Sequence, residues 1–532
     1  MAPPRWSFRC CPLLDDDAMK VMGQAITQAV AGGGTACERL ERVRADVKLL
    51  IRRREETQSL QRGREKGKIQ AEIDARRKQV GLGLGPAPNA PPSVQEAAVN
   101  AAAIAKLVER KNKILDAEER EWLQDRGFAA HAEDRPTKDF YVRLQESDPE
   151  RRMPVEEVDP HDGRGPPVRD PKHLCDSARS HFSKRFRQTY DEGSPAVHAA
   201  RNQCLGPIRV KYRLPPEAAA RMNVDSFLGT ENVTTAIREL ARHKTPGDDG
   251  FPADFYAAFA DVLAPLLAEA YKECRAQGRL TPTMRRGVIS LVYKKKGSRR
   301  SWQNYRPLTV SATEYRILAK AAQLRLNEVM QYVVSPSQTA NQHDKEIRES
   351  TALVQLIAQR CAEQDIDGLL LQLDGEKAFD MVQHRWLAEV LEAMGFPPDF
   401  RDLVALLYRD AELVVKVNGH HGDAFTPLNG VKQGCPLSPL LYILSLQPLL
   451  ASLEEDPHIH GIAIPGDHGV GHEEARVSAY ADDLLLMLRG YADLPAAWRY
   501  IEPYLAASGG AVNWGKTQVL RCGPLRRPGH AG

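Results

Sequence analysis

The sequence predicts an α+β fold, and three observations lead to this prediction. From about residue 225 to residue 520, stretches with helical periodicity alternate with short apolar runs of strand length. One of these runs stops at Asp374, and another has the pattern of a hairpin over Val477–Leu488. Residues 1–215 carry helical patterns without such an alternation. Segregated helical and strand-containing regions of this kind are typical of α+β proteins.

Composition sets the broad class of the protein. The chain has 532 residues, 42% hydrophobic and 27% charged, enough for about three or four domains. Its formal net charge of +3 does not by itself indicate a nucleic-acid-binding protein. The nine cysteines include no Cys-x-x-Cys pair, which predicts reduced thiols rather than disulfides or a zinc module.

The sequence also excludes membrane and secretory signals of the usual kind. No apolar run reaches the ~20 residues of a membrane span. Near the start, Arg5 and Arg9 are followed by acidic residues rather than by the apolar core of a signal peptide. We therefore expect a soluble, intracellular protein that does not contact membranes. Nothing in the sequence gives its oligomeric state.

The amino-terminal part is expected to be helical and charged. A short coiled-coil seam is predicted by the spacing of its apolar residues, Leu40, Val43, Val47 and Leu50. The basic stretch 51–68 that follows has no apolar stripe, which favours a solvated helix. An arm that contacts phosphates is the alternative interpretation.

Changes in composition divide the chain into segments. A stretch rich in Gly and Pro is typical of a linker, and Ser93 after it is a candidate N-cap of a long helix. The predicted segments are a charged, partly disordered amino-terminal segment 1–82, a linker 83–92, a helical connector with an irregular Pro-rich stretch 93–215, a folded domain 216–523 and a disordered tail 524–532.

Within the folded domain, the elements preceding Asp374 follow from periodicity and turn residues. They are an amphipathic helix 233–244, a turn 246–250, a long helix 254–278 ended by Gly278, a strand within 285–297, and a helix 315–333.

Carboxylates mark the ends of the apolar runs. In the hairpin, Ala481, Asp482 and Asp483 lie at the bend between two short strands. Adjacent carboxylates in an apolar setting need a compensating partner, and a divalent cation takes such oxygen ligands. A solvated turn is the commoner explanation of an isolated Asp-Asp pair. A buried strand that ends at Asp374, followed by Gly375 and a helix from about residue 384 to 394, offers a second carboxylate for one metal cage.

Two further stretches are candidates for contact with a nucleotide or nucleic acid. Gln433 and Gly434 form a loop before a leucine-rich helix that starts after Ser438, and such a turn can hold a nucleotide with backbone groups. An ordinary turn is the alternative. The stretch 293–308 mixes aromatic side chains with cations, which suits backbone contact and stacking, with a solvated face as the alternative. Its cations are Lys294, Lys295, Lys296, Arg299, Arg300 and Arg306.

Taken together and in this order, these stretches resemble the fingers and palm of reverse transcriptases from non-LTR (LINE-type) retrotransposons. The matching segments are HKTPGDDGFPADFY, SWQNYRPLTVSATEYRILAK, LDGEKAFDMV, GVKQGCPLSPLLY, AYADD and SGGAVNWGKTQVL. The resemblance covers residues 225 to 520, and RPTKDFYVRL, residues 135–144, weakly resembles the connector that precedes this domain. It implies a right-hand polymerase fold whose antiparallel palm sheet is backed by helices. It further implies RNA-templated addition of dNTPs to a DNA primer.

The resemblance also implies roles for individual residues. Asp374 and Asp482 would bind two Mg²⁺ ions (Mn²⁺ being the alternative), with Asp483 as a supporting carboxylate and the Gly375 carbonyl nearby. Phe379 would exclude a 2′-hydroxyl by bulk, with plain core packing as the alternative. The remaining roles are triphosphate binding by Lys295, Lys296 and Arg306, lining of the nucleotide pocket by Gln433 and Gly434, and proton donation to pyrophosphate by Lys516.

The sequence departs from this family pattern in places. Asp344 and Lys345 stand where the family has a glycine–arginine pair. No endonuclease or thumb pattern is recognised, so we expect a fragment of a larger element protein. Two other functions stay open: an inactive, polymerase-like nucleic-acid-binding protein, and an intron-encoded maturase. Nuclear localisation is implied by the family resemblance alone.

Overall fold

A computed structural model describes residues 16–79, 94–127, 154–159, 166–187, 193–341, 345–465 and 472–526. These residues divide into two compact units, a helical unit that includes residues 254–266 and a mixed unit of helices and sheets. Several predicted features lie outside the described residues: the linker 83–92, the stretch 135–144, Asp344, and residues 527–532 of the predicted tail.

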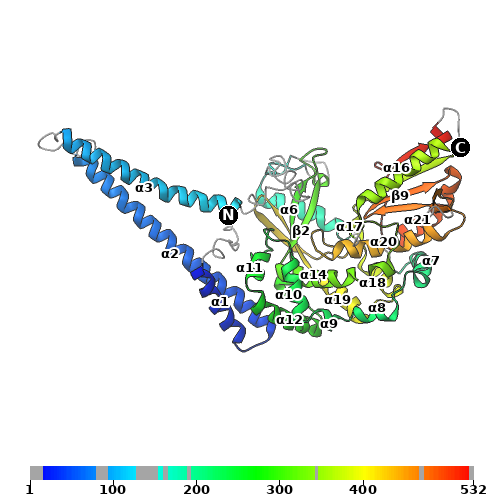
Figure 1. Cartoon of the computed structure of the whole chain (residues 1–532), viewed down its shortest axis with the longest axis horizontal. Coiled ribbons are helices and arrows are strands. Elements are labelled where there is room, and N and C mark those ends of the chain that lie inside the picture. The colour runs from blue at the N-terminus through cyan, green and yellow to red at the C-terminus, as the bar shows by residue number, and fades with distance from the viewer. Residues whose placement is uncertain are drawn as a thin grey trace. The chain divides into compact units, whose positions relative to one another are not determined.

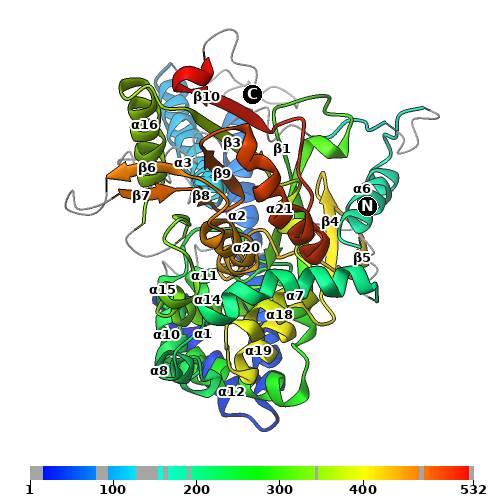
Figure 2. The same cartoon turned by 90° about the vertical axis from the view of Figure 1, so that its right-hand side faces the viewer.

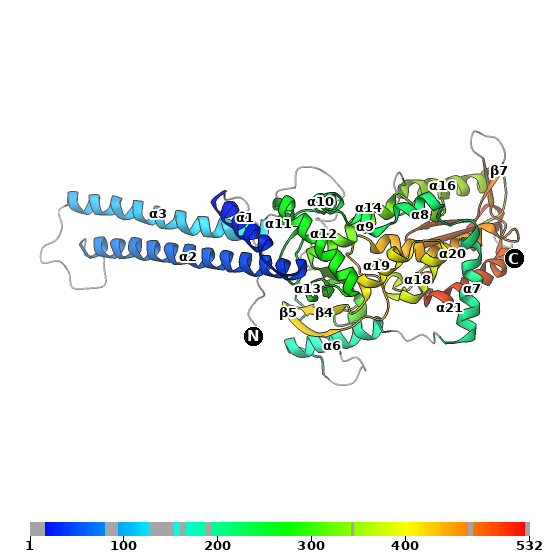
Figure 3. The same cartoon turned by 90° about the horizontal axis from the view of Figure 1, so that it is seen from below.

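The helical unit contains α1 (Asp16–Ala31), α2 (Ala36–Gln79) and α3 (Val94–Gly127). Figures 1 and 3 show α2 and α3 running side by side, and α1 packs on α2. The predicted seam on α2 is buried at Leu40, Val43 and Val47, but it continues through Ile51, whereas Leu50 is partly exposed. The basic stretch 51–68 is helical, as the solvated-helix interpretation expects.

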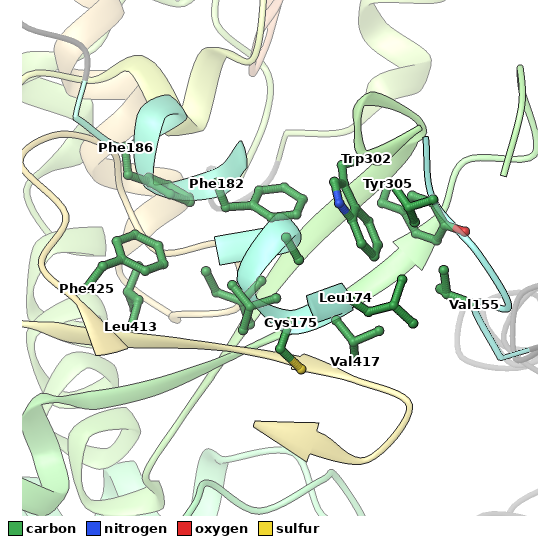
Figure 4. Close-up of a cluster of buried hydrophobic side chains, with 14 residues drawn as sticks. Val155, Leu174, Cys175, Phe182, Phe186, Trp302, Tyr305, Leu413, Val417 and Phe425 are labelled. Atoms are coloured by element: carbon green, nitrogen blue, oxygen red, sulfur yellow. The ribbon is translucent and has the colours of Figure 1, made fainter. Parts of the chain in front are cut away.

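One sheet of the mixed unit corresponds to the predicted fingers. Its strand order is β2 (Tyr305–Ser311), β1 (Arg286–Tyr293), β4 (Glu412–Val417), β5 (His420–Phe425). The β1–β2 and β4–β5 pairs are antiparallel, and the β1–β4 pair is parallel. Helix α6 (Pro171–Arg185) packs on β4 and β5, and Figure 4 shows the aromatic and aliphatic side chains buried between them.

The second sheet corresponds to the predicted palm. Its order is β10 (Gln518–Cys522), β3 (Gly368–Asp374), β9 (Asp483–Leu488), β8 (Val477–Tyr480), and every pair is antiparallel. Successive side chains of β3 point to opposite faces. Leu370 packs with Ile357 of α16 (Ile347–Glu363), and Leu373 faces α18 (His384–Ala393), α20 (Ser438–Glu455) and α21 (Leu494–Ser508). Figure 2 shows this sheet between α16 and α21. The predicted α+β class is confirmed.

The remaining helices and strands of the described residues surround the two sheets or belong to the helical unit. They are α7 (Pro195–Val210), α8 (Pro216–Arg221), α9 (Val224–Phe227), α10 (Thr230–Glu239), α11 (Ala253–Ala258), α12 (Ala260–Gln277), α13 (Pro282–Arg285), α14 (Thr313–Asn327), α15 (Met330–Val333), α17 (Ala378–Met381), α19 (Pro398–Tyr408), and the paired β6 (Ile462–Pro465) and β7 (His472–Ala475). Among the described residues, no helix is both long and apolar enough to span a membrane.

Several predicted element bounds differ from the structure. The helix expected over 233–244 ends at Glu239 as α10, and the helix expected over 315–333 is divided into α14 and α15. The long helix expected over 254–278 is interrupted at Phe259, so that α11 and α12 are separate helices. Helix α12 then ends before Gly278, as predicted, with this glycine in a left-handed conformation. Residues 524–526, expected in a disordered tail, belong to a 3-10 helix in which Leu525 is buried.

The packing of the mixed unit does not follow the predicted boundary between residues 215 and 216. Helices α6 and α7 precede that boundary, but both pack within the mixed unit. On α7 the buried Arg201 donates hydrogen bonds to the carbonyl of Ala507 in α21 and to Gln383 and Glu389 at α18. This packing could not be predicted from the sequence, because an arginine has the same local pattern whether it is buried or solvated.

Candidate active site

The two strand ends predicted to carry carboxylates meet in the palm sheet. The β3–β9 register pairs Asp374 directly with Asp483, and Asp482 lies in the turn just before β9. Asp374 and Asp482 line one small cavity of about 70 Å³, while Asp483 is exposed and lines a groove on the α16 side of the sheet. The structure therefore brings all three carboxylates to one edge of the sheet: Asp374 and Asp483 are direct cross-strand partners, and Asp374 and Asp482 line the same cavity.

The electrostatics of the cavity favour a positive charge beside Asp482. Burial of the Asp482 side chain raises the pKa of its carboxyl group, and the negative charges of Asp483 and Asp374 raise this pKa further. Lys516 opposes this shift, and its Nζ donates a hydrogen bond of 2.8 Å to Oδ2 of Asp374. Lys516 is presented by a turn that starts at Asn513, whose N–H donates to the Asp374 carbonyl.

Whether these residues fit a divalent metal can be judged from their chemistry. Carboxylate oxygens are the ligands that Mg²⁺ prefers, and a cation would offset the burial and repulsion acting on Asp482. Across the described part of the chain, no group of three or more His, Cys, Asp or Glu side chains converges as a complete cage. The donors thus fit a metal held by Asp374 and Asp482 together with groups from outside the chain, such as water or phosphate oxygens.

A buried glutamine holds the turn between β8 and β9, in which Asp482 lies. Ala481 has a left-handed φ of 55°, an uncommon conformation for a residue with a side chain. Oε1 of Gln338 accepts the Ala481 N–H at 3.0 Å, and Nε2 of Gln338 donates to the Ala481 carbonyl at 3.4 Å. Backbone hydrogen bonds from Ala479 to Ser337 and from Thr339 to Ala479 place Gln338 beside β8. Sequence reasoning missed Gln338, because a polar residue between two helices has the pattern of an exposed loop.

Replacing Gln338 with alanine is expected to lower the rate of primer extension by about 10- to 100-fold, because the turn before Asp482 loses both anchoring hydrogen bonds. Steady-state extension on an RNA template measures the effect. Gln355→Ala, an exposed substitution on α16, is the matched control and should extend like the wild type. Equal rates for the Gln338 and Gln355 variants would contradict this role.

An aromatic side chain and a glycine-containing loop face each other near Asp374. Phe379 on α17 stacks on Tyr442 of α20, with ring centroids 4.8 Å apart and planes 12° apart. The loop is joined to α17 by the Val431 N–H, which donates to the Phe379 carbonyl. Gly434 has a φ of +107°, and a side chain there would clash with the Thr309 carbonyl at 2.8 Å. The loop that contains Gln433 and Gly434 is therefore fixed between α17 and β2.

The cations predicted to hold a triphosphate are only partly placed at the site. Burial is the largest cause that lowers the pKa of Lys294. The positive charges of Arg185, Arg306 and Lys516 lower it further, which shows that these side chains lie nearby. Lys294, Lys295 and Lys296 are all exposed after β1, and Nζ of Lys294 donates a hydrogen bond of 2.7 Å to the Gln303 carbonyl. Among the lysines of this basic run, Lys294 is thus the one that lies beside Arg306. The sequence alone did not distinguish it from its neighbours.

Comparison with known proteins agrees with this arrangement. Residues 293–529 match the family described as reverse transcriptase (RNA-dependent DNA polymerase), so the chain contains a reverse transcriptase domain. Similar proteins come from transposons and retrotransposable elements. The transposon TX1 uncharacterized 149 kDa protein of Xenopus laevis is 31% identical over 373 residues, which are 68% of this chain and 26% of that protein.

Two retrotransposable-element proteins are also similar. The Pol polyprotein from type-1 element R2 of Popillia japonica is 28% identical over 54% of this chain and 38% of that protein. The Pol polyprotein from type-2 element R2DM of Drosophila melanogaster is 30% identical over 35% of this chain and 16% of that protein. The matched region is therefore similar to proteins of transposons and retrotransposable elements. The chain spans well under half the length of these relatives.

Proposed function

We propose that this chain is an RNA-directed DNA polymerase that adds deoxynucleotides to the 3′ end of a primer. One observation carries the proposal: Asp374 and Asp482, far apart in the sequence, line a single cavity at the ends of palm strands. The match to the reverse transcriptase family over residues 293–529 supports the same activity. An RNA template, a DNA primer and dNTPs are the proposed partners.

Reverse transcriptases generally use divalent metal ions, and Mg²⁺ is the proposed ion here, with Asp374 and Asp482 as its protein ligands and Asp483 as a nearby carboxylate. A bound metal of this kind supplies positive charge that activates the attacking hydroxyl and stabilises the leaving pyrophosphate. We propose that Lys516, which pairs with Asp374, is displaced toward the pyrophosphate when substrate binds and donates a proton there.

The neighbouring side chains have proposed binding roles. Phe379, braced by Tyr442, would lie under the nucleotide sugar and exclude a 2′-hydroxyl. Gln433 and Gly434 would line the pocket, with the Gly375 backbone beside the carboxylates. The triphosphate would be held by Arg306 and Lys294, together with Lys295 and Lys296 from the adjacent turn. Clustered cations repel one another less once a phosphate lies between them, which favours this role.

The test is extension of a labelled DNA primer on an RNA template by the purified chain with dNTPs and Mg²⁺. The proposal expects template-length products that disappear when EDTA is added and return with Mg²⁺. A DNA template of the same sequence shows whether RNA is preferred. No extension on either template, with the protein folded and the template-primer bound, would contradict the proposal.

The ion pair between Lys516 and Asp374 favours one alternative, a polymerase-like protein that binds nucleic acid without extending it. A lysine held at 2.8 Å from a proposed metal ligand competes with the cation for that carboxylate. Fluorescence anisotropy of labelled template-primer separates the two functions. Tight binding without extension at saturating Mg²⁺ would select the alternative.

A further inference from the structure

Helix α6 ends beside the proposed nucleotide pocket and lies outside the matched region 293–529. The helix begins at a strong local signal: the Asp170 side chain accepts the N–H groups of Lys172 and His173, and Pro171 occupies the first turn. Its apolar face, including Phe182, is buried on the fingers sheet (Figure 4). The position of its last residue, Arg185, is therefore fixed by the fold.

Arg185 forms a buried ion pair with Asp380 of α17. The Arg185 side chain is 8% exposed and the Asp380 side chain is 0% exposed, and Nη2 of Arg185 contacts Oδ2 of Asp380. Burial raises the pKa of Asp380, and Arg185 opposes that shift. Neither Nε nor Nη1 of Arg185 has a hydrogen-bond partner in the described part of the chain, so Asp380 is the group that compensates this buried cation.

The other oxygen of Asp380 reaches the proposed pocket. Oδ1 of Asp380 accepts a hydrogen bond of 2.8 Å from Nε2 of Gln433, and Asp380 directly follows Phe379 on α17. A second link runs through the backbone, because the carbonyl of Phe186 accepts the N–H groups of Leu428 and Asn429 at the start of the Gln433 loop. The end of α6 thus contacts both sides of the pocket.

We propose that Arg185 is a positioning residue of the nucleotide site, which holds Asp380 so that Asp380 orients the Gln433 amide opposite Phe379. This inference rests on the proposed polymerase function. Without the guanidinium, the buried Asp380 would keep only the Gln433 hydrogen bond and the charge of Lys294, and it would turn toward water or take up a proton. Either change alters the acceptor that Gln433 needs.

The test compares Arg185→Met with Lys184→Met, a control that removes one positive charge from the exposed residue next to it on α6. On an oligo(dT)-primed poly(rA) template, Arg185→Met is expected to raise the KM for dTTP by at least about tenfold, with a smaller change in kcat. Lys184→Met should keep the wild-type KM. An unchanged KM in Arg185→Met would overturn the proposal.

A double variant separates positioning from stability. In Arg185→Met/Asp380→Asn the buried charge is removed, so the melting temperature should recover toward the wild-type value. The raised KM for dTTP should persist, because the amide at position 380 has no guanidinium to orient it. Recovery of both the melting temperature and the KM would show that Arg185 acts through stability alone.

A binding measurement covers the case in which the wild-type chain extends no primer, which would contradict the proposed function by itself. Thermal unfolding with increasing dTTP and Mg²⁺ then gives the nucleotide affinity directly. The inference expects the wild type to be stabilised at about tenfold lower dTTP than Arg185→Met. Equal stabilisation of the two, or none in either, would overturn the inference.

Discussion

Replacing Asp482 with alanine is expected to abolish primer extension, with a loss of at least about 10³-fold. This carboxylate shares a cavity with Asp374, and its charge is unfavourable there unless a cation lies beside it. Loss of a metal ligand removes several kcal/mol of charge stabilisation in the transition state, which corresponds to about this factor. Extension assays with Mg²⁺ titrated over several orders of magnitude measure the effect.

The control for Asp482→Ala is Asp402→Ala on α19, because Asp402 is exposed and lies on a helix that packs away from the cavity. That variant should extend at the wild-type rate. Thermal unfolding of Asp482→Ala should show a melting temperature no lower than that of the wild type, because a buried carboxylate with a raised pKa destabilises the fold once it is ionised. Sustained extension by Asp482→Ala would show that Asp482 is not a metal ligand.

Replacing Phe379 with valine is expected to let the enzyme incorporate ribonucleotides. The Phe379 ring is held flat against Tyr442, so it has little freedom to move away from a 2′-hydroxyl. A valine leaves room where the ring edge lay, and discrimination by bulk in a pocket amounts to about 10- to 200-fold. The ratio of kcat/KM for dTTP to that for UTP on one template should fall by a factor in this range.

Tyr442→Phe is the matched control for Phe379→Val. It keeps the stacked pair of rings and removes the hydroxyl, so discrimination between dTTP and UTP should stay close to that of the wild type. If Phe379 serves only to fill the core, Phe379→Val will lower the melting temperature and leave the ratio unchanged. That outcome would show that Phe379 packs in the core and does not select the sugar.

The elements that carry the carboxylates could be predicted from sequence. The strand that ends at Asp374 and the hairpin around Asp482 are short apolar runs, and the structure forms β3, β8 and β9 there. Such patterns are local, because the side chains alternate between two faces within a few residues. The helices that start at His384 and Ser438 were also predictable, because their apolar residues recur within a few turns of helix.

Contacts between distant polar residues could not be predicted in this way. Gln338 holds the turn at Ala481, Lys516 pairs with Asp374, and Arg185 pairs with Asp380 across long separations in the chain. A polar side chain has the same local pattern whether it is solvated or buried with a partner, so periodicity carries no information about it.

The order of strands in the palm has a consequence for biosynthesis. Strand β3 leaves the ribosome early, but its neighbours β9 and β10 are translated more than a hundred residues later. Until β9 and then β10 have emerged, the backbone N–H and C=O groups along the edges of β3 lack their partners, and unpaired edges promote aggregation. The yield of correctly folded protein should therefore depend on chaperones that shield this strand during translation.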